Sequence, residues 1–247
     1  MLLQVDNLIA GYGNVEVLHG LSIAVGEGER VGLFGPNGHG KTTLLRTISG
    51  LVPARDGTIQ FQDARIAGLS ARRIIERGLV HVPQANTLFP RMTVLENLTL
   101  GAYTRRTWAR RRESLARVFE LFPRLAERRS QYSRTLSGGE RQMLSIGVGL
   151  MGTPTLLMLD EPTLGLAPKI KDELAVAIGQ IASSGVTMLV VDQDLELLLS
   201  VCQRLYLIEK GQVSLQTEEG ATIQQSEVLE MYFGKVALTA SDGGRGA

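Results

Sequence analysis

The sequence predicts an α/β fold with a mostly parallel sheet, an antiparallel β subdomain and an inserted α-helical subdomain. Apolar runs of strand length, such as Leu79–Val82 and Leu156–Leu159, stop at polar residues, as buried strands do at the edge of a sheet. A glycine-rich loop follows Arg30–Phe34 and leads into a helical pattern. Alternating apolar and polar residues near the start of the chain are typical of antiparallel strands with one wet face.

Composition limits the classes of protein. The chain has 247 residues, of which 44% are apolar, enough for one large domain or two small ones. Its 26 basic and 25 acidic residues nearly cancel, so no overall field attracts nucleic acid. No segment reaches the roughly 18 consecutive apolar residues of a membrane span, and the start lacks a signal-peptide pattern, so we expect a cytoplasmic protein. The single cysteine, Cys202, excludes an internal disulfide and is expected in the core.

The first elements are expected to be strands. Alternation with a period of two predicts strands over Leu2–Val5, Leu21–Val25 and Gly57–Phe61, separated by glycine turns. Tyr12 has a glycine on either side and is expected on a loop between these strands. An aromatic side chain there either stacks on a ligand ring or covers a turn, and the sequence favours neither.

The loop after Arg30–Phe34 fits the P-loop pattern G-x-x-x-x-G-K-T, in which backbone N–H groups and a helix N-terminus face one anion. We expect Lys41 to contact the β- and γ-phosphates of a nucleotide and Thr42 to bind Mg²⁺. His39 is expected to contribute its backbone N–H rather than its ring. The residues expected to bind phosphate are Gly35, Pro36, Asn37, Gly38, His39, Gly40, Lys41, Thr42 and Thr43.

The next stretch predicts a short helix over Ala71–Arg77 and a strand over Leu79–Val82. Gln84 follows this strand, where open α/β sheets place ligand contacts, although an ordinary loop glutamine would also fit. Thr93 and Glu96 then have the spacing of a capping box, which predicts a helix start.

Helical periodicity continues to about residue 133, and residues 91–152 are expected to form the helical subdomain. Within it, Arg105–Arg134 contains ten arginines and three glutamates. We interpret this run as a solvated helical face, with a position near anionic lipid headgroups as the alternative. A single domain is expected over residues 1–239, followed by a disordered glycine-rich tail over residues 240–247.

A second informative stretch consists of Leu136, Ser137, Gly138, Gly139 and Glu140. Ser137 and Glu140 have capping-box spacing, so a helix should begin here. Two glycines in a first turn cost roughly 1 kcal/mol each relative to alanine, which indicates that another group approaches the backbone closely. The helix N-terminus is therefore expected to be a second anion site.

The strand Leu156–Leu159 ends at Asp160 and Glu161. We expect Asp160 to hold Mg²⁺ through its water shell and Glu161 to orient and polarise the attacking water. A solvated acidic turn is the alternative, but it does not account for the adjacent P-loop.

The remaining elements repeat this arrangement. One apolar stripe predicts a helix, Val186–Val191 predicts another buried strand, and polar residues including Gln193 follow it. A turn at Lys210 and Gly211 predicts a hairpin. The stripe consists of Ile170, Leu174, Ile178 and Ile181.

Taken together, Gly35–Thr43, Gln84, Leu136–Glu140 and Leu156–Glu161 resemble the nucleotide-binding subunit of ATP-binding-cassette (ABC) transporters over about residues 2–234. The resemblance implies the ABC ATPase fold with its P-loop NTPase core, ATP hydrolysis, and ATP and Mg²⁺ as cofactors. It also implies that Tyr12 stacks on adenine and that Gln84 touches Mg²⁺ and faces the membrane partner.

The same resemblance implies a head-to-tail dimer. Ser137–Gly139 of one subunit would close over the γ-phosphate held by the P-loop of the other. A P-loop alone leaves the γ-phosphate facing water, and charge stabilisation supplied in trans is a recurring way to complete a phosphoryl-transfer site.

Three further stretches are similar to the smaller ATPase of branched-chain amino acid importers: Phe89–Leu98, Leu121–Leu125 and Glu161–Pro168. This similarity implies a subunit at the cytoplasmic face of the inner membrane that drives solute uptake. Its partners would be two permeases, a second ATPase and, indirectly, a periplasmic solute-binding protein, with no nucleic acid. The natural dimer would be a heterodimer, and a homodimer could form in isolation.

Departures from the family pattern leave alternatives open. Many cassette ATPases have His where this chain has Gln193, and Asp where it has Ala167. Gln193 can hydrogen-bond a γ-phosphate beside Lys41 and Glu161, but it cannot carry a proton. A nucleotide-gated partner with little turnover is therefore one alternative. Urea importers resemble the chain better at Gln84, and a soluble cassette ATPase is disfavoured because there is one P-loop and no sustained heptad run.

Overall fold

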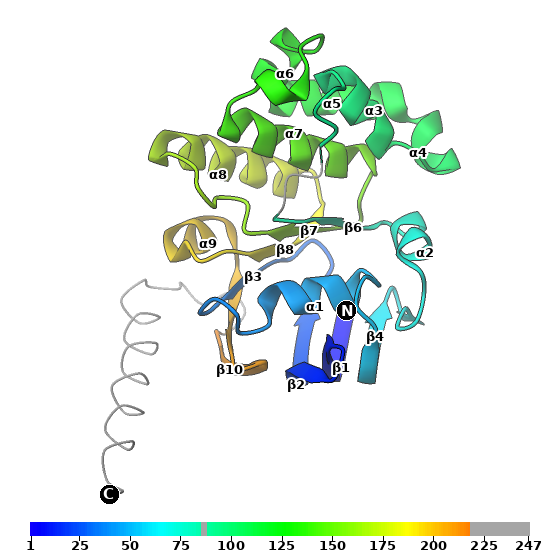
Figure 1. Ribbon diagram of the computed structural model, residues 1–247, viewed down its shortest axis with the longest axis vertical. Coiled ribbons are helices and arrows are strands. Elements are labelled where there is room, and N and C mark those ends of the chain that lie inside the picture. Colours follow the sequence, from blue (N-terminus) through cyan, green and yellow to red (C-terminus); the bar gives the residue numbers. More distant parts are fainter. Residues whose placement is uncertain (85–87, 218–247) are drawn as a thin grey trace, which may run out of the picture.

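The computed structural model describes residues 1–84 and 88–217, and their strands form two sheets (Figure 1). The four-stranded antiparallel sheet has the order β2-β1-β4-β5. Its strands are β1 (Leu3–Tyr12), β2 (Val15–Val25), β4 (Ala54–Phe61) and β5 (Ala64–Arg65). The six-stranded sheet has the order β10-β9-β3-β8-β7-β6, and only β10, at one edge, runs antiparallel to its neighbour. Its strands are β3 (Arg30–Phe34), β6 (Leu79–Val82), β7 (Leu156–Asp160), β8 (Thr187–Val191), β9 (Arg204–Glu209) and β10 (Gln212–Gln216).

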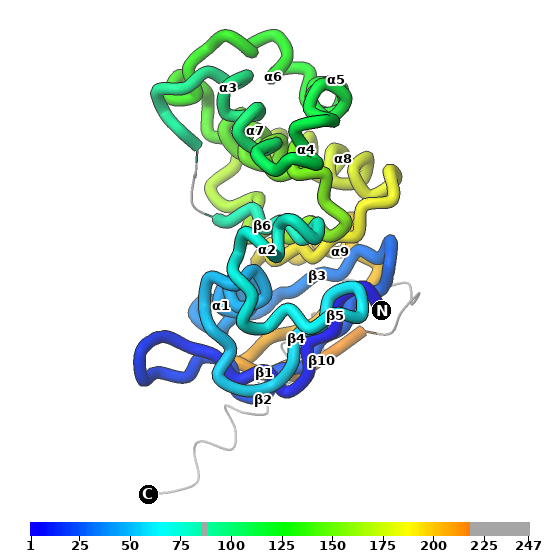
Figure 2. The backbone as a smooth tube through the Cα atoms, turned by 90° about the vertical axis from the view of Figure 1, so that its right-hand side faces the viewer, coloured from blue at the N-terminus to red at the C-terminus, as the bar shows by residue number. Residues whose placement is uncertain are grey.

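The helices lie on both faces of the six-stranded sheet. Figure 1 shows α1 between the two sheets, whereas α3 to α8 lie on the other side of the six-stranded sheet. Figure 2 shows the same separation from the side, with the helical lobe and the antiparallel sheet at opposite ends of the molecule. The helices are α1 (Lys41–Ile48), α2 (Ala71–Glu76), α3 (Val94–Gly101), α4 (Arg105–Ala109), α5 (Arg111–Leu121), α6 (Pro123–Glu127), the 3₁₀ turn η1 (Ser133–Thr135), α7 (Gly138–Met151), α8 (Pro168–Ser183) and α9 (Leu195–Val201).

Two hydrophobic cores lie on the two faces of the parallel sheet. Because successive side chains of a strand point to opposite faces, Leu157 and Leu159 of β7 enter the core that includes the helical lobe. Leu156 and Met158 enter the core that includes α1 and the antiparallel sheet. All four side chains are fully buried, which explains why this part of the sequence is a continuous apolar run. Cys202 is buried in the helical-lobe core, as expected.

The α/β fold class is confirmed, and the structure refines several boundaries. Tyr12 was expected on a loop, but it is the last residue of β1 and pairs with Val15 of β2. Gly13 has a φ of 53°, which lets the chain turn tightly enough for both strands to extend this far. The capping boxes at Thr93 and Ser137 are both present. The expected tail over residues 240–247 and part of the irregular stretch after Gln84 lie outside the described residues.

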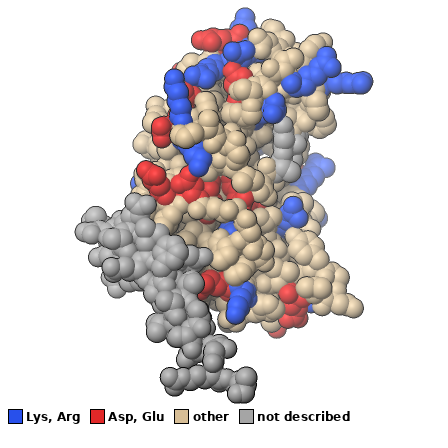
Figure 3. Space-filling model, turned by 60° about the vertical axis from the view of Figure 1, so that its left-hand side comes forward, with Lys and Arg blue, Asp and Glu red and all other residues tan. Residues whose placement is uncertain are grey.

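The arginine-rich run does not form one continuous helix. The run divides into α4, α5 and α6, because Thr104 caps a new helix and Pro123 begins another. Most of its arginines are exposed, as a solvated face requires. Figure 3 shows, on one face of the molecule, basic side chains spread over the upper part and acidic side chains gathered in a band below them.

Candidate functional site

The expected site residues follow neighbouring strands at one edge of the sheet. Strands β3, β8, β7 and β6 are adjacent and parallel, so the loops after them lie along the same edge. These loops carry Gly35–Thr43, Gln193, Glu161 and Gln84 respectively. The topology therefore brings together residues that are up to about 160 positions apart in the sequence.

The P-loop backbone has no room for side chains at two glycines. Gly35 has a φ of 139°, and a Cβ there would lie 2.2 Å from the carbonyl oxygen of Ile208. Gly40 caps α1 with a φ of 105°, and its Cβ would lie 2.7 Å from Leu18. Both positions require glycine because of the backbone conformation and the lack of space. The two glycines thus let the loop pack closely against β9 and β2 before the N-terminus of α1.

His39 uses its ring as well as its backbone. Its Nδ1 accepts a hydrogen bond from the backbone N–H of Lys210 at 3.2 Å. Its carbonyl oxygen accepts another from the N–H of Gly211 at 3.0 Å. Sequence reasoning assigned no role to this ring. The two bonds tie the P-loop to the β9–β10 hairpin.

Lys41 is nearly buried and lies across its own loop. Its Nζ donates to the carbonyl oxygens of Gly35 at 2.7 Å and Pro36 at 2.9 Å. Burial lowers the pKa of Lys41 from its usual 10.5, while the charges of Glu161 and Asp160 oppose that effect. The anionic phosphates of a nucleotide would favour the charged ammonium further.

Thr42 and Asp160 form a polar pair beside the P-loop. The Oγ1 of Thr42 donates to Oδ1 of Asp160 at 3.1 Å. Asp160 is 1% exposed, and burial raises its pKa from 3.8 to about 6. Its other oxygen, Oδ2, is buried and has no hydrogen-bond partner among residues 1–84 and 88–217. A buried carboxylate oxygen without a partner fits a role in holding a hydrated cation.

Glu161 is held between two amides. Its Oε2 accepts a hydrogen bond from Nε2 of Gln84 at 2.7 Å, and its Oε1 accepts one from Nε2 of Gln193 at 3.0 Å. The backbone of Glu161 has a φ of 48°, an uncommon conformation for a residue other than glycine, which often marks functional sites. Gln84 was expected to touch Mg²⁺, but its amide nitrogen points to Glu161 in this structure.

Asp192 is an organising residue that sequence reasoning did not single out. Its Oδ2 accepts hydrogen bonds from the N–H and Oγ1 of Thr163, and its Oδ1 accepts from the N–H groups of Gln193 and Asp194. Asp194 also pairs with Lys171 of α8 at 2.6 Å. The only signal in the sequence was an acidic residue directly after a buried strand. Asp192 joins the segment after Glu161 to the segment that carries Gln193.

The glycine-rich helix start at Ser137 lies on α7. Ser137 and Glu140 form a reciprocal capping box, and Arg128 pairs with Glu140 at 2.8 Å. A Cβ on Gly139 would lie 2.5 Å from Ile170, so this glycine is required by packing within the chain. A Cβ on Gly138 would meet nothing within 4 Å. The expectation that another group approaches the backbone closely therefore remains a prediction for Gly138, whereas at Gly139 the approaching group is Ile170 of the same chain.

The cavity at the P-loop is small and is not lined by the glycine-rich helix start. Its volume is about 150 Å³. The described residues that line it are Asn37, Gly38, Gly40, Lys41, Thr42, Thr43 and Glu161. Residues 136–140 do not line this cavity, so within one chain they do not cover the phosphate site.

Tyr12 lies at the end of β1 and is 45% exposed. Its hydroxyl accepts a hydrogen bond from Nη1 of Arg46 on α1 at 3.3 Å. Since α1 begins at the P-loop, this bond connects Tyr12 to the helix that follows the P-loop. One exposed ring near α1 is compatible with stacking on a base.

These features place a P-loop at the edge of a parallel sheet, with two carboxylates and two amides beside it. A family model described as "ABC transporter" matches residues 18–164, and the chain belongs to this family. It is an ATP-binding and ATP-hydrolysing protein of the ABC class.

Among its relatives, the chain is 38% identical over 233 residues to BraG of Pseudomonas aeruginosa, a high-affinity branched-chain amino acid transport ATP-binding protein. That match covers 94% of this chain and 100% of BraG. It is 31% identical over 234 residues to LptB of Escherichia coli K12, a lipopolysaccharide export system ATP-binding protein, covering 94% of this chain and 97% of LptB. The ADP conformation of MJ1267, an ATP-binding cassette of an ABC transporter, has a TM-score of 0.80 at 26% identity, covering 94% of this chain and 98% of MJ1267.

Proposed function

We propose that this chain is the ATPase subunit of an ABC importer for branched-chain amino acids or related small solutes. One observation carries the catalytic part of the proposal. Glu161 is held by Gln84 and Gln193 at the same sheet edge as Lys41 and Thr42. This arrangement supports a carboxylate that is fixed in place for acting on a water molecule next to bound phosphate.

Each residue has a separate part in the proposed reaction. Lys41 exchanges its bonds to loop carbonyls for bonds to the β- and γ-phosphates. Thr42 and Asp160 hold Mg²⁺, to which the unpartnered Oδ2 of Asp160 is suited. When bound, Mg²⁺ neutralises charge on the phosphate oxygens. Glu161 orients and polarises the attacking water, and Gln193 positions Glu161 without exchanging a proton, because an amide does not titrate.

A second ATPase subunit completes the proposed site. Residues 136–140 of the same chain do not line the cavity at the P-loop, so they do not cover it within one chain. We place Ser137 and Gly138 of one subunit over the P-loop of the other, since a helix N-terminus with open space at Gly138 can approach an anion closely. Tyr12 is placed on adenine in the same complex.

The similarity to BraG supports the importer assignment, and the similarity to LptB is the reason that export is the competing hypothesis. No helix in the described part of the chain is long and apolar enough to cross a membrane. We place the protein at the cytoplasmic face of the inner membrane, bound to permease subunits. A urea-type importer is the alternative solute class that Gln84 keeps open.

Two experiments test this proposal at its two levels. In the first, Lys41→Ala removes the ammonium that binds phosphate, so Mg²⁺-dependent ATP hydrolysis should be lost, while Lys169→Ala on the exposed start of α8 should leave it unchanged. In the second, the native complex is purified and its membrane and solute-binding subunits are identified. Permeases together with a solute-binding protein support import, whereas permeases with a lipopolysaccharide-export partner would overturn it.

A further inference from the structure

A second cavity lies near the amino ends of the parallel strands, whereas the nucleotide site lies at their carboxyl ends. It has a volume of about 380 Å³ and is larger than the cavity at the P-loop. Its walls come from the α4–α5 segment, from α7 and α8, and from the turns before β7 and β8. These turns precede the amino ends of their strands. The two sites are therefore separated by the length of the strands.

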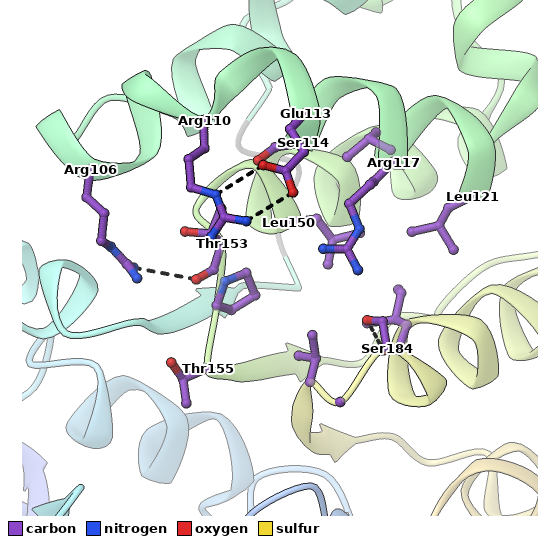
Figure 4. Close-up of a pocket in the computed structure, with 15 residues that line it drawn as sticks. Arg106, Arg110, Glu113, Ser114, Arg117, Leu121, Leu150, Thr153, Thr155 and Ser184 are labelled. Atoms are coloured by element: carbon purple, nitrogen blue, oxygen red, sulfur yellow. Dashed lines mark hydrogen bonds and ion pairs between the residues drawn. The ribbon is translucent and has the colours of Figure 1, made fainter.

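The lining of this cavity carries a net positive charge. Three arginines line it, namely Arg106, Arg110 and Arg117, and Glu113 is the one acidic residue among the described residues of its wall. Figure 4 shows the three arginine side chains extending from the α4–α5 segment toward the turns that contain Thr153 and Ser184. Like charges that converge in a concave site attract anions.

The three arginines differ in how well they are neutralised. Arg110 donates two hydrogen bonds to Glu113, at 3.1 and 3.0 Å, so this pair is nearly neutral (Figure 4). Among residues 1–84 and 88–217, Arg106 donates a single hydrogen bond, to the carbonyl oxygen of Thr153 at 3.5 Å. Arg117 has no hydrogen bond or salt bridge in the described part of the chain, and its charge adds only a minor contribution, after that of Arg110, to lowering the pKa of Glu113. Two guanidinium groups thus remain available for an anion, and guanidinium matches carboxylate in a bidentate way.

The rest of the wall is suited to a hydrocarbon body. Its partly exposed aliphatic members are Leu121, Leu150 and Val186, whereas Val118 and Ile181 are 1% exposed. A volume of about 380 Å³ falls near the lower end of the range for small-molecule sites. A bare inorganic anion would fill only a small part of this volume, because even a water molecule takes only about 30 Å³ in the liquid. Charge on one side and aliphatic surface on the other favour an amphipathic anion.

We propose that this cavity binds a small aliphatic carboxylate. Its carboxylate group pairs with Arg117 and Arg106, and its branched hydrocarbon body packs against the partly exposed Leu121, Leu150 and Val186. The site does not depend on the importer assignment, because none of its residues belongs to the nucleotide site. Its occupant contacts both the helical lobe and the turns of the parallel sheet.

The test uses 4-methylpentanoate as the probe and isothermal titration calorimetry of the full chain. We expect one site per chain with a Kd of about 1 mM or tighter. The uncharged amide of the same shape, 4-methylpentanamide, should bind at least about 10-fold more weakly, because charged hydrogen bonds contribute more than neutral ones. Arg117→Gln should weaken binding of the carboxylate by at least about 10-fold.

The matched control is Arg112→Gln, which removes an exposed arginine of the same helix that does not line the cavity. It should change the Kd less than about twofold, and both variants should keep the wild-type rate of ATP hydrolysis without the probe. The proposal is overturned if 4-methylpentanoate does not bind, if the amide binds equally well, or if both arginine variants weaken binding alike.

Two further measurements distinguish a small carboxylate from other anions that the arginines could bind. Inorganic phosphate that binds as tightly as the carboxylate would overturn the role of the aliphatic wall. Sedimentation with phosphatidylglycerol vesicles that depends on Arg117, in the absence of carboxylate binding, would instead assign the arginines to a lipid surface and overturn the proposal.

Discussion

Burial of Asp160 has a cost to stability that can be measured directly. The carboxyl group is 1% exposed, and burial raises its pKa from 3.8 to about 6. This rise corresponds to about 3 kcal/mol, at about 1.4 kcal/mol per pH unit. Asp160→Asn removes the charge but keeps an oxygen that can accept the hydrogen bond from Thr42. We therefore expect the variant to be about 3 kcal/mol more stable than the wild type at pH 7.5.

The direction of the pH dependence follows from proton binding. Between about pH 4 and pH 6 the folded carboxyl holds a proton that the unfolded chain has released. The free energy of unfolding of the wild type therefore falls as the pH rises through this window, and the full cost remains at neutral pH. At pH 4.5 the advantage of Asp160→Asn should shrink to about 1 kcal/mol.

The assay is urea unfolding at pH 4.5 and pH 7.5, followed by circular dichroism, in buffer without nucleotide or magnesium, because ligands stabilise the folded state. Asp172→Asn, at an exposed position of α8, is the control and should change the free energy of unfolding by less than about 0.5 kcal/mol at both pH values. A destabilised Asp160→Asn variant at pH 7.5, or an effect independent of pH, would refute the reasoning. The same variant should lose magnesium-dependent hydrolysis, which would make Asp160 a residue kept for function at the expense of stability.

Three further predictions concern packing and positioning. Glu29→Gln weakens the buried bidentate pair with Arg204, whose two hydrogen bonds measure 2.7 and 2.8 Å. Urea titrations should show a free energy of unfolding that is lower by about 3 kcal/mol or more. A loss below about 1 kcal/mol would contradict this prediction. Gly139→Ala should lower the free energy of unfolding by about 1–3 kcal/mol, because its Cβ would clash with a side chain of α8. Gly138→Ala, in open space, should raise the free energy of unfolding by up to about 1 kcal/mol but weaken ATP-dependent dimerisation measured by light scattering. Equal unfolding curves for the two variants would disprove the distinction. Asp192→Asn should lower kcat about 10-fold or more with little change in the Kd for ATP, since it positions loops rather than binding phosphate; an unchanged kcat would exclude that role.

The sequence was sufficient for the fold class and for most elements, because the signals were local. The strand Leu79–Val82 was predicted with the bounds that the structure gives, since a continuous apolar run ends at a proline. The capping boxes at Thr93 and Ser137 were found from spacing alone and are confirmed. The P-loop was recognised from its pattern, and the family that it indicated is confirmed.

Features that depend on contacts between distant segments were beyond reach of the sequence. Tyr12 was expected on a loop, since its flanking glycines suggested a break, but the pairing of β1 with β2 extends the strand to this residue. The ring of His39 bonds to a hairpin about 170 positions away, and no local pattern indicates such a contact. The need for glycine at position 139 arises from Ile170 in α8, which the sequence places 31 residues later. Asp192 was missed for the same reason.

The proposed role of Glu161 is the central claim, and Glu161→Gln tests it most directly. The single-turnover rate of Mg²⁺-dependent ATP hydrolysis should be measured for this variant and for the wild type, together with the Kd for ATP. Loss of the carboxylate that acts on the attacking water should lower the rate by about 10²-fold or more while ATP still binds. A variant that binds ATP and hydrolyses it at the wild-type rate would contradict the account.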